Sequence, residues 1–243
     1  MKLSSNTVLI TGGATGIGFA LAEEFLAAGS KVLICGRREA RLEEAQRKHP
    51  EILYKVCDVS DQNGREDLLQ WARENEVNVL VNNAGIQRDI DFTKGMEDFA
   101  SGESEIKINF ETPVYLTALF TPYLMAQKEA AVLNVTSGLA YMTSPRPTVP
   151  IYVATKSAIH CFTAALRKQL TETPVKVFEL IAPIMDTEIN VEGRLKRGMV
   201  SHGIKPQVFA REVMRGLAAD EYVIHSALEH YPQPLALLVK END

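Results

Sequence analysis

Short apolar runs rich in β-branched residues alternate with amphipathic stretches along most of this chain. The runs are almost continuously apolar, which is typical of parallel strands covered on both faces of a sheet, and the intervening stretches show helical spacing. The predicted strands are residues 7–11, 31–35, 52–57, 77–81, 131–136 and 175–181, with residues 221–224 as a last edge strand. The predicted helices are residues 17–28, 38–48, 61–74, 103–127 and 152–170.

This alternation predicts an α/β fold, a Rossmann-type doubly wound parallel sheet flanked by helices on both faces. No repeat or low-complexity linker interrupts it, so residues 1–243 are predicted to form a single domain. Residues 143–150, rich in proline and threonine, are predicted to form a loop directly before a helix. The chain from Glu192 onward is irregular in pattern and is interpreted as either a flexible lid or a plain surface excursion.

Composition narrows the class of protein. The chain has 26 Lys and Arg against 31 Asp and Glu, and no basic tract, so binding to nucleic acid is not predicted. The first residues lack a signal-peptide core, and no apolar stretch approaches the roughly 20 residues that cross a bilayer. Cys35, Cys57 and Cys161 lack the spacing of metal ligands and are expected to be reduced and buried. The sequence therefore predicts a cytoplasmic protein without membrane insertion and without a metal site.

A glycine-rich segment, TGGATGIG, follows the first predicted strand and opens the first predicted helix. Gly12 permits a tight turn, Gly16 lets backbone amides approach a pyrophosphate, and Gly18 permits close packing of the helix on the sheet. Glycine also ends strands without any functional reason, but here the strand before the motif and the helix after it are both predicted. The segment therefore indicates a dinucleotide site.

The end of the second predicted strand bears on the choice of cofactor. An acidic residue there would bind the ribose 2′-hydroxyl of NAD, but this chain has Gly36, followed by Arg37 and Arg38. Two guanidinium groups favour a 2′-phosphate, so NADP(H) is preferred and NAD(H) remains an alternative. Arg38 and Arg41 are equally consistent with a solvated helix start. Asp58, after the third strand, either meets the adenine amino group or caps the next helix.

Three further features point to proton transfer. The segment NNAG ends the fourth strand with small and amide residues that let backbone lie close to a ligand, although a simple turn also favours them. Tyr152 and Lys156 share one helix face, and an ammonium near a phenol lowers the phenol pKa from about 10. Such a pair is frequent by chance, so its weight comes from its neighbours. Ser137, at the end of the fifth strand, can hydrogen-bond a substrate oxygen.

Together, TGGATGIG, NNAG, Asn109, Ser137 and YVATK resemble, in this order, the compact branch of the short-chain dehydrogenase/reductase family. The resemblance implies that Tyr152 is the general acid/base, that Lys156 lowers its pKa and binds the nicotinamide ribose, and that Ser137 orients the substrate. It implies that Asn109 marks a helix irregularity holding a water that links Lys156 to solvent. The alternative for Asn109 is a polar residue satisfied between helices. The cofactor contacts implied are Gly12, Thr15, Gly16, Ile17, Gly18, Arg37, Arg38, Asp58, Val59, Asn83, Ala84, Gly85, Tyr152, Lys156 and Thr187.

The chain departs from the family pattern in two places. Aligned on Thr187, the usual Pro-Gly after the sixth strand is Ala182-Pro183, and proline lacks an N–H, so the local backbone is expected to differ. Ser137 and Tyr152 are 15 positions apart, which is wide for the family, and the extra residues fall in the proline-rich loop, which is predicted to shape the substrate pocket. The local runs NTVLITGG, VLVNNAGIQ, ALFTPYLM and VTSGLA resemble a bacterial subgroup, the DltE type, found with teichoic-acid D-alanylation genes.

The resemblance implies reversible interconversion of a carbonyl and an alcohol with NADP(H), acting on a small molecule, in a homodimer or homotetramer. The alternative from another class is a nucleotide-binding regulator that has kept the fold and lost turnover. Neither reading identifies the substrate, its stereochemistry or the direction of the reaction.

Overall fold

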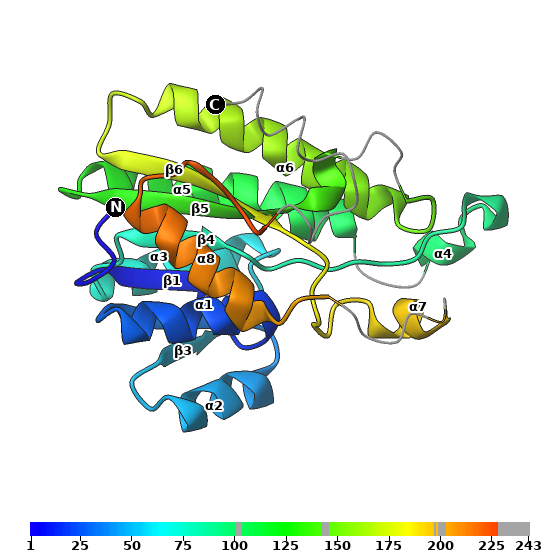
Figure 1. Cartoon of the computed structure of the whole chain (residues 1–243), viewed down its shortest axis with the longest axis horizontal. Helices are drawn as coiled ribbons and strands as arrows, with labels where there is room; N and C mark the ends of the chain where they lie inside the picture. Colours follow the sequence, from blue (N-terminus) through cyan, green and yellow to red (C-terminus); the bar gives the residue numbers. More distant parts are fainter. Residues whose placement is uncertain (101–103, 142–145, 197, 199–202, 228–243) are drawn as a thin grey trace.

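The computed structural model describes residues 1–100, 104–141, 146–196, 198 and 203–227. Its strands form a seven-stranded parallel sheet in the order β3-β2-β1-β4-β5-β6-β7, which confirms the predicted doubly wound fold (Figure 1). Each predicted strand is present, with ends shifted by at most two residues. The strands are β1 (Thr7–Thr11), β2 (Lys31–Gly36), β3 (Leu53–Val56), β4 (Val79–Asn82), β5 (Ala130–Ser137), β6 (Val175–Ala182) and β7 (Val223–His225).

Helices cover both faces of the sheet, as the alternating pattern predicts (Figure 1). On one face the core includes α1 (Gly16–Ala27), α2 (Glu39–Lys48) and α8 (Pro206–Ala218). On the other face it includes α3 (Gln62–Glu74), α5 (Thr112–Met125) and α6 (Pro150–Gln169). Shorter elements are η1 (Phe92–Lys94), α4 (Glu97–Ala100), the π-helix η2 (Lys107–Glu111), η3 (Gly138–Tyr141) and α7 (Val191–Lys196).

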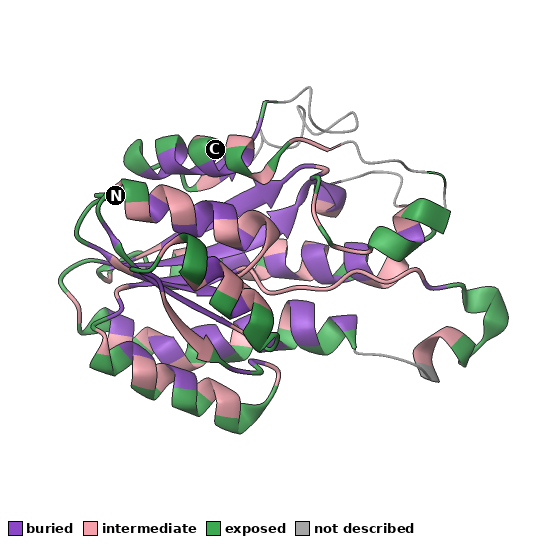
Figure 2. Ribbon diagram, turned by 90° about the horizontal axis from the view of Figure 1, so that it is seen from below, coloured by how far each residue is buried: buried purple, intermediate pink, exposed green. Residues whose placement is uncertain are grey.

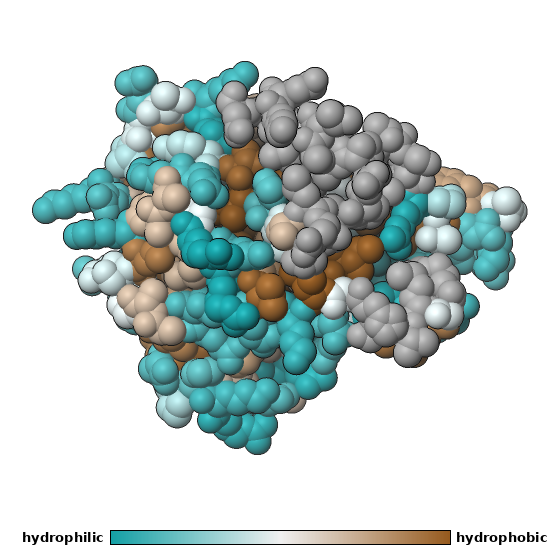
Figure 3. Space-filling model, in the orientation of Figure 1, coloured by the Kyte–Doolittle hydropathy of each residue, from teal (hydrophilic) through white to brown (hydrophobic). Residues whose placement is uncertain are grey.

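The strands are apolar throughout because consecutive side chains enter opposite layers. In β1, Val8 and Ile10 pack with α1 and α8, whereas Leu9 packs with α3 and α5. Val32 and Leu33 of β2 divide in the same way. Figure 2 shows the buried strands at the centre and exposed residues on the outer sides of the helices. In Figure 3 the surface over α2 is mainly hydrophilic, as expected for amphipathic helices.

The stretch predicted as one helix over residues 103–127 is not regular. Its described part contains the π-helix Lys107–Glu111 followed by α5, which ends at Met125. Pro113 lies in the first turn of α5, and because proline has no N–H it cannot donate the α-helical bond to the carbonyl of Asn109. The irregularity implied at Asn109 is therefore present, and a proline next to it gives the physical reason.

The irregular pattern predicted from Glu192 onward is wrong for much of that segment. Residues 206–218 form α8, whose Phe209 and Val213 are fully buried against the sheet and α1. Pro206 occupies the first turn of this helix, a position where its missing N–H is not needed. Gly203 lies against the carbonyl of Ile184, where a side chain would collide. Gly203 and Pro206, which suggested irregular chain, thus serve close packing and a helix start. The lid interpretation covers the chain from Glu192 onward, and residues 197, 199–202 and 228–243 of that segment lie outside the described residues.

Two smaller predictions also need correction. Cys161 is exposed rather than buried, because it lies off the helix face of α6 that carries Tyr152, Lys156 and Ile159; Cys35 is buried, as predicted, and so is Cys57. The helix predicted from Tyr152 begins at Pro150, and residues 143–145 of the predicted loop lie outside the described residues. Among the helices that the structure describes, none has the length and apolar character of a membrane span.

Candidate active site

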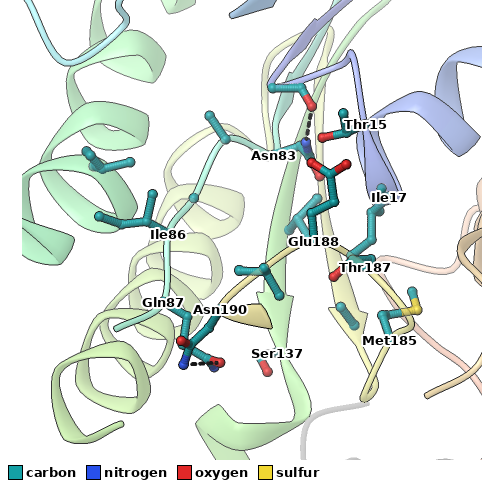
Figure 4. Close-up of a pocket in the computed structure, with 18 of the residues that line it drawn as sticks. Thr15, Ile17, Asn83, Ile86, Gln87, Ser137, Met185, Thr187, Glu188 and Asn190 are labelled. Atoms are coloured by element: carbon teal, nitrogen blue, oxygen red, sulfur yellow. Dashed lines mark hydrogen bonds between the residues drawn. The ribbon is translucent and has the colours of Figure 1, made fainter. Parts of the chain in front are cut away.

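A cavity of about 590 Å³ opens at the carboxyl ends of the strands, around the point between β1 and β4 where the strand order reverses. Ligands of doubly wound sheets bind at this position. Figure 4 shows Thr15, Thr187 and Glu188 toward one end, and Gln87, Asn190 and Ser137 toward the other. Gly18 and Asn109 are the two predicted site residues outside its lining. The predicted residues that line it are Gly12, Thr15, Gly16, Ile17, Arg37, Arg38, Asp58, Val59, Asn83, Ala84, Gly85, Ser137, Tyr152, Lys156 and Thr187.

The glycine-rich segment has the backbone that its sequence predicts. Gly16 has a φ of +56°, which lies in the left-handed region that disfavours residues with a side chain. A Cβ at Gly18 would lie 2.5 Å from the carbonyl oxygen of Gly12 and from Nδ2 of Asn83, so only glycine permits this approach of helix and sheet. The first turn and the start of α1 therefore form a tight cradle.

The start of α1 fits a pyrophosphate. Thr15 precedes the helix but its hydroxyl makes no hydrogen bond to the first turn. The first backbone N–H groups of a helix have no partner within it, and they lie at the positive end of its dipole. Thr187 lies beside this turn. A Cβ placed on Gly16 would lie 3.3 Å from Cγ2 of Thr187. Backbone donors, a cavity and close-packed glycines together satisfy the requirements of a dinucleotide phosphate.

The segment NNAG ties the end of β4 to the end of β1. Nδ2 of Asn83 donates to the carbonyl oxygens of Thr11 at 2.9 Å and Gly12 at 3.1 Å. The backbone N–H groups of Asn83 and Ala84 both donate to Oγ1 of Thr11, each at 3.0 Å. The amide of Asn83 is thus used to hold the glycine turn. Thr11 was not predicted, although its place just before Gly12 is a local signal that could have indicated it.

Glu188 is a residue that the sequence does not single out. It lies at the end of the cavity lined by Thr15 and Arg38, the adenosine end. Its carboxylate accepts hydrogen bonds from Arg38 at 3.2 Å and from Arg41 at 2.8 Å. Arg38 also donates to Oγ1 of Thr15 at 3.4 Å. Arg37, Arg38 and Arg41 all line the cavity, so this helix start faces the predicted position of the 2′-phosphate.

Asp58 does not cap the next helix. Its carboxylate accepts from the backbone N–H of Ser60 at 2.9 Å, whereas α3 is capped by Asp61, which accepts from Gly64 at 3.1 Å. Burial alone would raise the pKa of Asp58, but the hydrogen bonds from Ser60 and the charge of Arg37 bring it below its ordinary value. The helix-cap interpretation is therefore wrong, and an ionised carboxylate lines the cavity.

The chemical end brings together three of the predicted catalytic side chains. Tyr152, Lys156 and Ser137 are all buried and all line the cavity. Ser137 acts to lower the pKa of Tyr152, and Nζ of Lys156 lies 5.7 Å from the centre of the Tyr152 ring. The same ammonium donates to the carbonyl oxygen of Val135 at 2.8 Å. Helix α6 and strand β5 thus place one phenol, one hydroxyl and one amine around a common point.

Burial dominates the titration of these groups. It raises the pKa of Tyr152 to about 12; the hydrogen bond with Ser137 lowers this pKa and the charge of Glu105 raises it further. Burial lowers the pKa of Lys156 to about 8. The direction of the Tyr152 pKa shift is opposite to the lowering that its pairing with Lys156 predicts, because burial of the phenolate is the largest cause of the shift.

The side chain of Asn109 clamps the backbone at Ile86. Its Oδ1 accepts from the N–H of Ile86 and its Nδ2 donates to the carbonyl of Ile86, both at 2.8 Å. Nδ2 also donates to Oγ1 of Thr155 at 3.2 Å. The side-chain amide is therefore satisfied mainly by the loop after β4 and only in part by the neighbouring helix α6, while the backbone carbonyl of Asn109 lacks a donor at Pro113.

The opposite wall of the chemical end consists of residues that no motif indicates. Nδ2 of Asn190 donates to Asp89 at 2.8 Å and to Gln87 at 3.4 Å (Figure 4). The lining here also includes Leu139, Arg146, Pro183, Ile184, Met185, Ile189 and Arg194. Within the described ranges, no group of three or more His, Cys, Asp or Glu side chains is placed to hold a metal ion.

A Rossmann-type sheet with a phosphate cradle at its switch point and a Ser-Tyr-Lys cluster beside it defines a class of dinucleotide-dependent oxidoreductases. The family model of the short chain dehydrogenases matches residues 6–198, and the chain belongs to this family. The chain is 49% identical over 219 residues to the uncharacterized oxidoreductase DltE of Bacillus subtilis, covering 89% of this chain and 86% of that protein. This similarity confirms the predicted DltE type.

Solved structures agree on the fold. A short-chain dehydrogenase/reductase from Burkholderia phymatum in complex with NAD superposes with a TM-score of 0.82 at 21% identity, covering 93% of this chain and 90% of that chain. A closed form of serine dehydrogenase complexed with NADP+ superposes with a TM-score of 0.80 at 22% identity, covering 94% and 97%. The two similar structures thus hold different cofactors on one fold.

Proposed function

We propose that this protein is an NADP(H)-dependent oxidoreductase that interconverts a carbonyl and an alcohol, with Tyr152 as the general acid/base. The observation that carries the proposal is the convergence of Ser137, Tyr152 and Lys156 at one end of the cavity whose other end is the phosphate cradle. A nucleotide site alone would not need a buried phenol at that point.

Each side chain has a defined part in the reducing direction. When bound, the nicotinamide cofactor exchanges a hydride with the carbonyl carbon and, in its oxidised form, brings a positive charge into the site. Ser137 donates a hydrogen bond to the carbonyl oxygen, and Tyr152 transfers its proton to that oxygen as negative charge develops. Lys156 holds the cofactor ribose and returns a proton to Tyr152 through water at the carbonyl of Asn109.

In the protein without cofactor the pKa of Tyr152 is about 12, so a nearby positive charge is needed to lower it. Each unit by which this pKa is lowered corresponds to about 1.4 kcal/mol of preference for the phenolate. The ammonium of Lys156 supplies such charge below its own pKa of about 8. Efficient proton exchange near neutral pH therefore depends on Lys156 together with the bound oxidised cofactor.

The arginines at the start of α2 support NADP(H) over NAD(H). The cavity lining there includes Arg37 and Arg38, and Gly36 stands where an acidic residue would select the 2′-hydroxyl. We further propose that residues 1–243 act as one domain with the substrate pocket in its C-terminal part, in a cytoplasmic homodimer or homotetramer acting on a small carbonyl or alcohol. The proposal includes no binding to nucleic acid and no insertion into a membrane.

The proposal is tested by following NADPH absorbance with a panel of small aldehydes, ketones and alcohols. Tyr152→Phe should lower turnover of any converted compound by about 10²–10⁴ while NADPH binding is unchanged, because it removes only the transferable proton. Tyr115→Phe, at an exposed tyrosine of α5, is the matched control and should keep full activity. Full activity in Tyr152→Phe would contradict the mechanism. Binding of NADPH without conversion of any compound favours the alternative, a catalytically silent nucleotide-binding regulator.

A further inference from the structure

The turn before α6 brings a guanidinium to the chemical end of the cavity. The N–H of Val149 bonds to the carbonyl of Arg146 at 3.4 Å, and Ile90 donates to the carbonyl of Thr148 at 3.1 Å. Val149 is buried and packs in one apolar cluster with Tyr152. This turn is therefore held against the proposed catalytic tyrosine, and its Arg146 lines the cavity.

Arg146 is not used by the fold. Its side chain forms no hydrogen bond or ion pair with another residue in the part of the chain that the structure describes. Among the described residues that line the cavity, the carboxylates are those of Asp58 and Glu188 at the adenosine end, and Glu188 is already bonded to Arg38. A guanidinium has five N–H donors and stays charged at any physiological pH. At this end of the cavity the described lining includes no carboxylate that could pair with Arg146.

The other arginine at this end differs. Arg194 donates to the carbonyl of Met185 at 3.1 Å and to the carbonyl of Thr187, so its guanidinium holds the backbone after β6. It still adds positive charge to this part of the lining. Arg146 thus combines access to the cavity with donors that the protein does not satisfy.

The remaining walls at this end are mainly apolar. Leu139, Ile184, Met185 and Ile189 face the cavity, and the amides of Gln87 and Asn190 bond to each other. A ligand that fits these walls has an apolar body, a reacting oxygen at Ser137 and Tyr152, and a negatively charged group that pairs with Arg146. Anionic oxygens are the groups that a guanidinium binds with two parallel hydrogen bonds.

We propose that the substrate carries an oxyanion, a carboxylate or a phosphate monoester, and that Arg146 binds it. This inference rests on the proposed function, since it assigns the substrate class of that same site. Binding the reacting oxygen at one end and the oxyanion at the other fixes the carbon between them for hydride exchange. The apolar walls select the spacer between the two groups.

The experiment uses the full chain loaded with NADP+, which has no hydride to transfer to the carbonyl probes, and measures binding by calorimetry, independently of turnover. The probes are two matched pairs: levulinate with its methyl ester, and dihydroxyacetone phosphate with dihydroxyacetone. The variants are Arg146→Gln, which removes the charge, and Arg146→Lys, which keeps it. Arg211→Gln, at an exposed arginine of α8, is the control.

At least one anionic probe should bind about tenfold more tightly than its neutral partner, as expected for charge-assisted hydrogen bonds. Arg146→Gln should remove this difference without changing binding of the neutral partner, Arg146→Lys should keep part of it, and Arg211→Gln should keep all of it. The pair that shows the difference identifies carboxylate or phosphate as the group.

Three results would overturn the inference: equal affinity for charged and neutral probes, no binding of either anion, or equal weakening of both partners by Arg146→Gln. These outcomes are separate from failure of the proposed function. Arg146-dependent binding of an anion in a protein whose turnover survives Tyr152→Phe would refute the mechanism and leave the oxyanion site standing. If NADPH itself does not bind, the proposed function fails. The same probes are then titrated into the protein without cofactor, and the same outcomes apply to the oxyanion site.

Discussion

Glu188 accepts a hydrogen bond from Arg38 across 150 positions of sequence, at 3.2 Å. Arg38 belongs to the adenosine end of the cavity and Glu188 to the chain that follows β6 beside Thr187. The proposed site of the 2′-phosphate is thus linked to the segment that leads to the chemical end. A phosphate arriving there would meet a carboxylate that is already bound to the same guanidinium.

Glu188→Gln should therefore tighten NADPH binding by about two- to fivefold, a modest change because the ion pair is exposed. Binding of NADH, which lacks the 2′-phosphate, should change less. Fluorescence titration with both cofactors measures this. Glu44→Gln is the control, because Glu44 bonds to Arg41 and Lys48 but not to Arg38. If NADPH binds Glu188→Gln more weakly than the unmodified protein, competition between the carboxylate and the phosphate is excluded.

Arg37→Ala should weaken NADPH binding by about tenfold or more and leave NADH binding nearly unchanged, because a guanidinium contributes mainly through the 2′-phosphate. Dissociation constants for the two cofactors measure the ratio. Arg47→Ala, at an exposed position near the end of α2, is the control. An unchanged preference in Arg37→Ala would mean that this side chain does not choose the cofactor.

A buried polar cluster behind β5 leads to a prediction about stability. The carboxylate of Glu179 is 1% exposed and accepts hydrogen bonds from Thr136 at 2.7 Å and Tyr141 at 3.0 Å, with Nδ1 of His160 at 3.0 Å. Glu179→Leu removes the buried carboxylate that these three groups share and should lower the free energy of unfolding by about 3–5 kcal/mol. Urea denaturation measures it. Glu172→Leu, at an exposed position, should change it by less than about 0.5 kcal/mol.

The strands and most helices could be predicted because burial on both faces leaves an apolar run that is visible without any distant contact. The helix irregularity at Asn109 was implied by resemblance alone and could not be derived from the residues themselves, since the effect of Pro113 on the carbonyl of Asn109 depends on which hydrogen-bond pattern the helix adopts. Helix α8 was missed because Gly203 and Pro206 are typical of irregular chain, and their actual roles require Ile184 and a helix start to be known.

The residues of the site likewise fall into those that could be predicted from sequence and those that could not. Gly16 and Gly18 could be recognised because the backbone that they permit is local, and the Ser-Tyr-Lys set was recognised by resemblance. Glu188 and Glu105 could not, because their partners, Arg38 and Arg88, lie in other elements and no short motif contains both members of either pair. Sequence likewise could not give the direction of the Tyr152 pKa, which depends on burial as well as on charge.

Glu105 should make stability depend on pH. It is a buried carboxyl whose backbone partner is the N–H of Arg88 at 3.1 Å, and burial raises its pKa from 4.5 to about 7. The folded protein therefore binds this proton more tightly than the unfolded chain does. The stability linked to the proton is fully present below pH 4.5 and is lost as the pH rises through 7.

Glu105→Gln keeps an oxygen acceptor for Arg88 and cannot ionise. Between pH 4.5 and 7 the unmodified protein should lose about 2 kcal/mol relative to this variant, allowing for solvent screening of the 1.4 kcal/mol that one pKa unit represents. Urea denaturation at several pH values measures the difference, with the exposed Glu97→Gln as control. Parallel stability curves for the variant and the unmodified protein would show that Glu105 has the same pKa folded and unfolded. Since the charge of Glu105 also raises the pKa of Tyr152, the variant should in addition shift the alkaline limb of any turnover profile to lower pH.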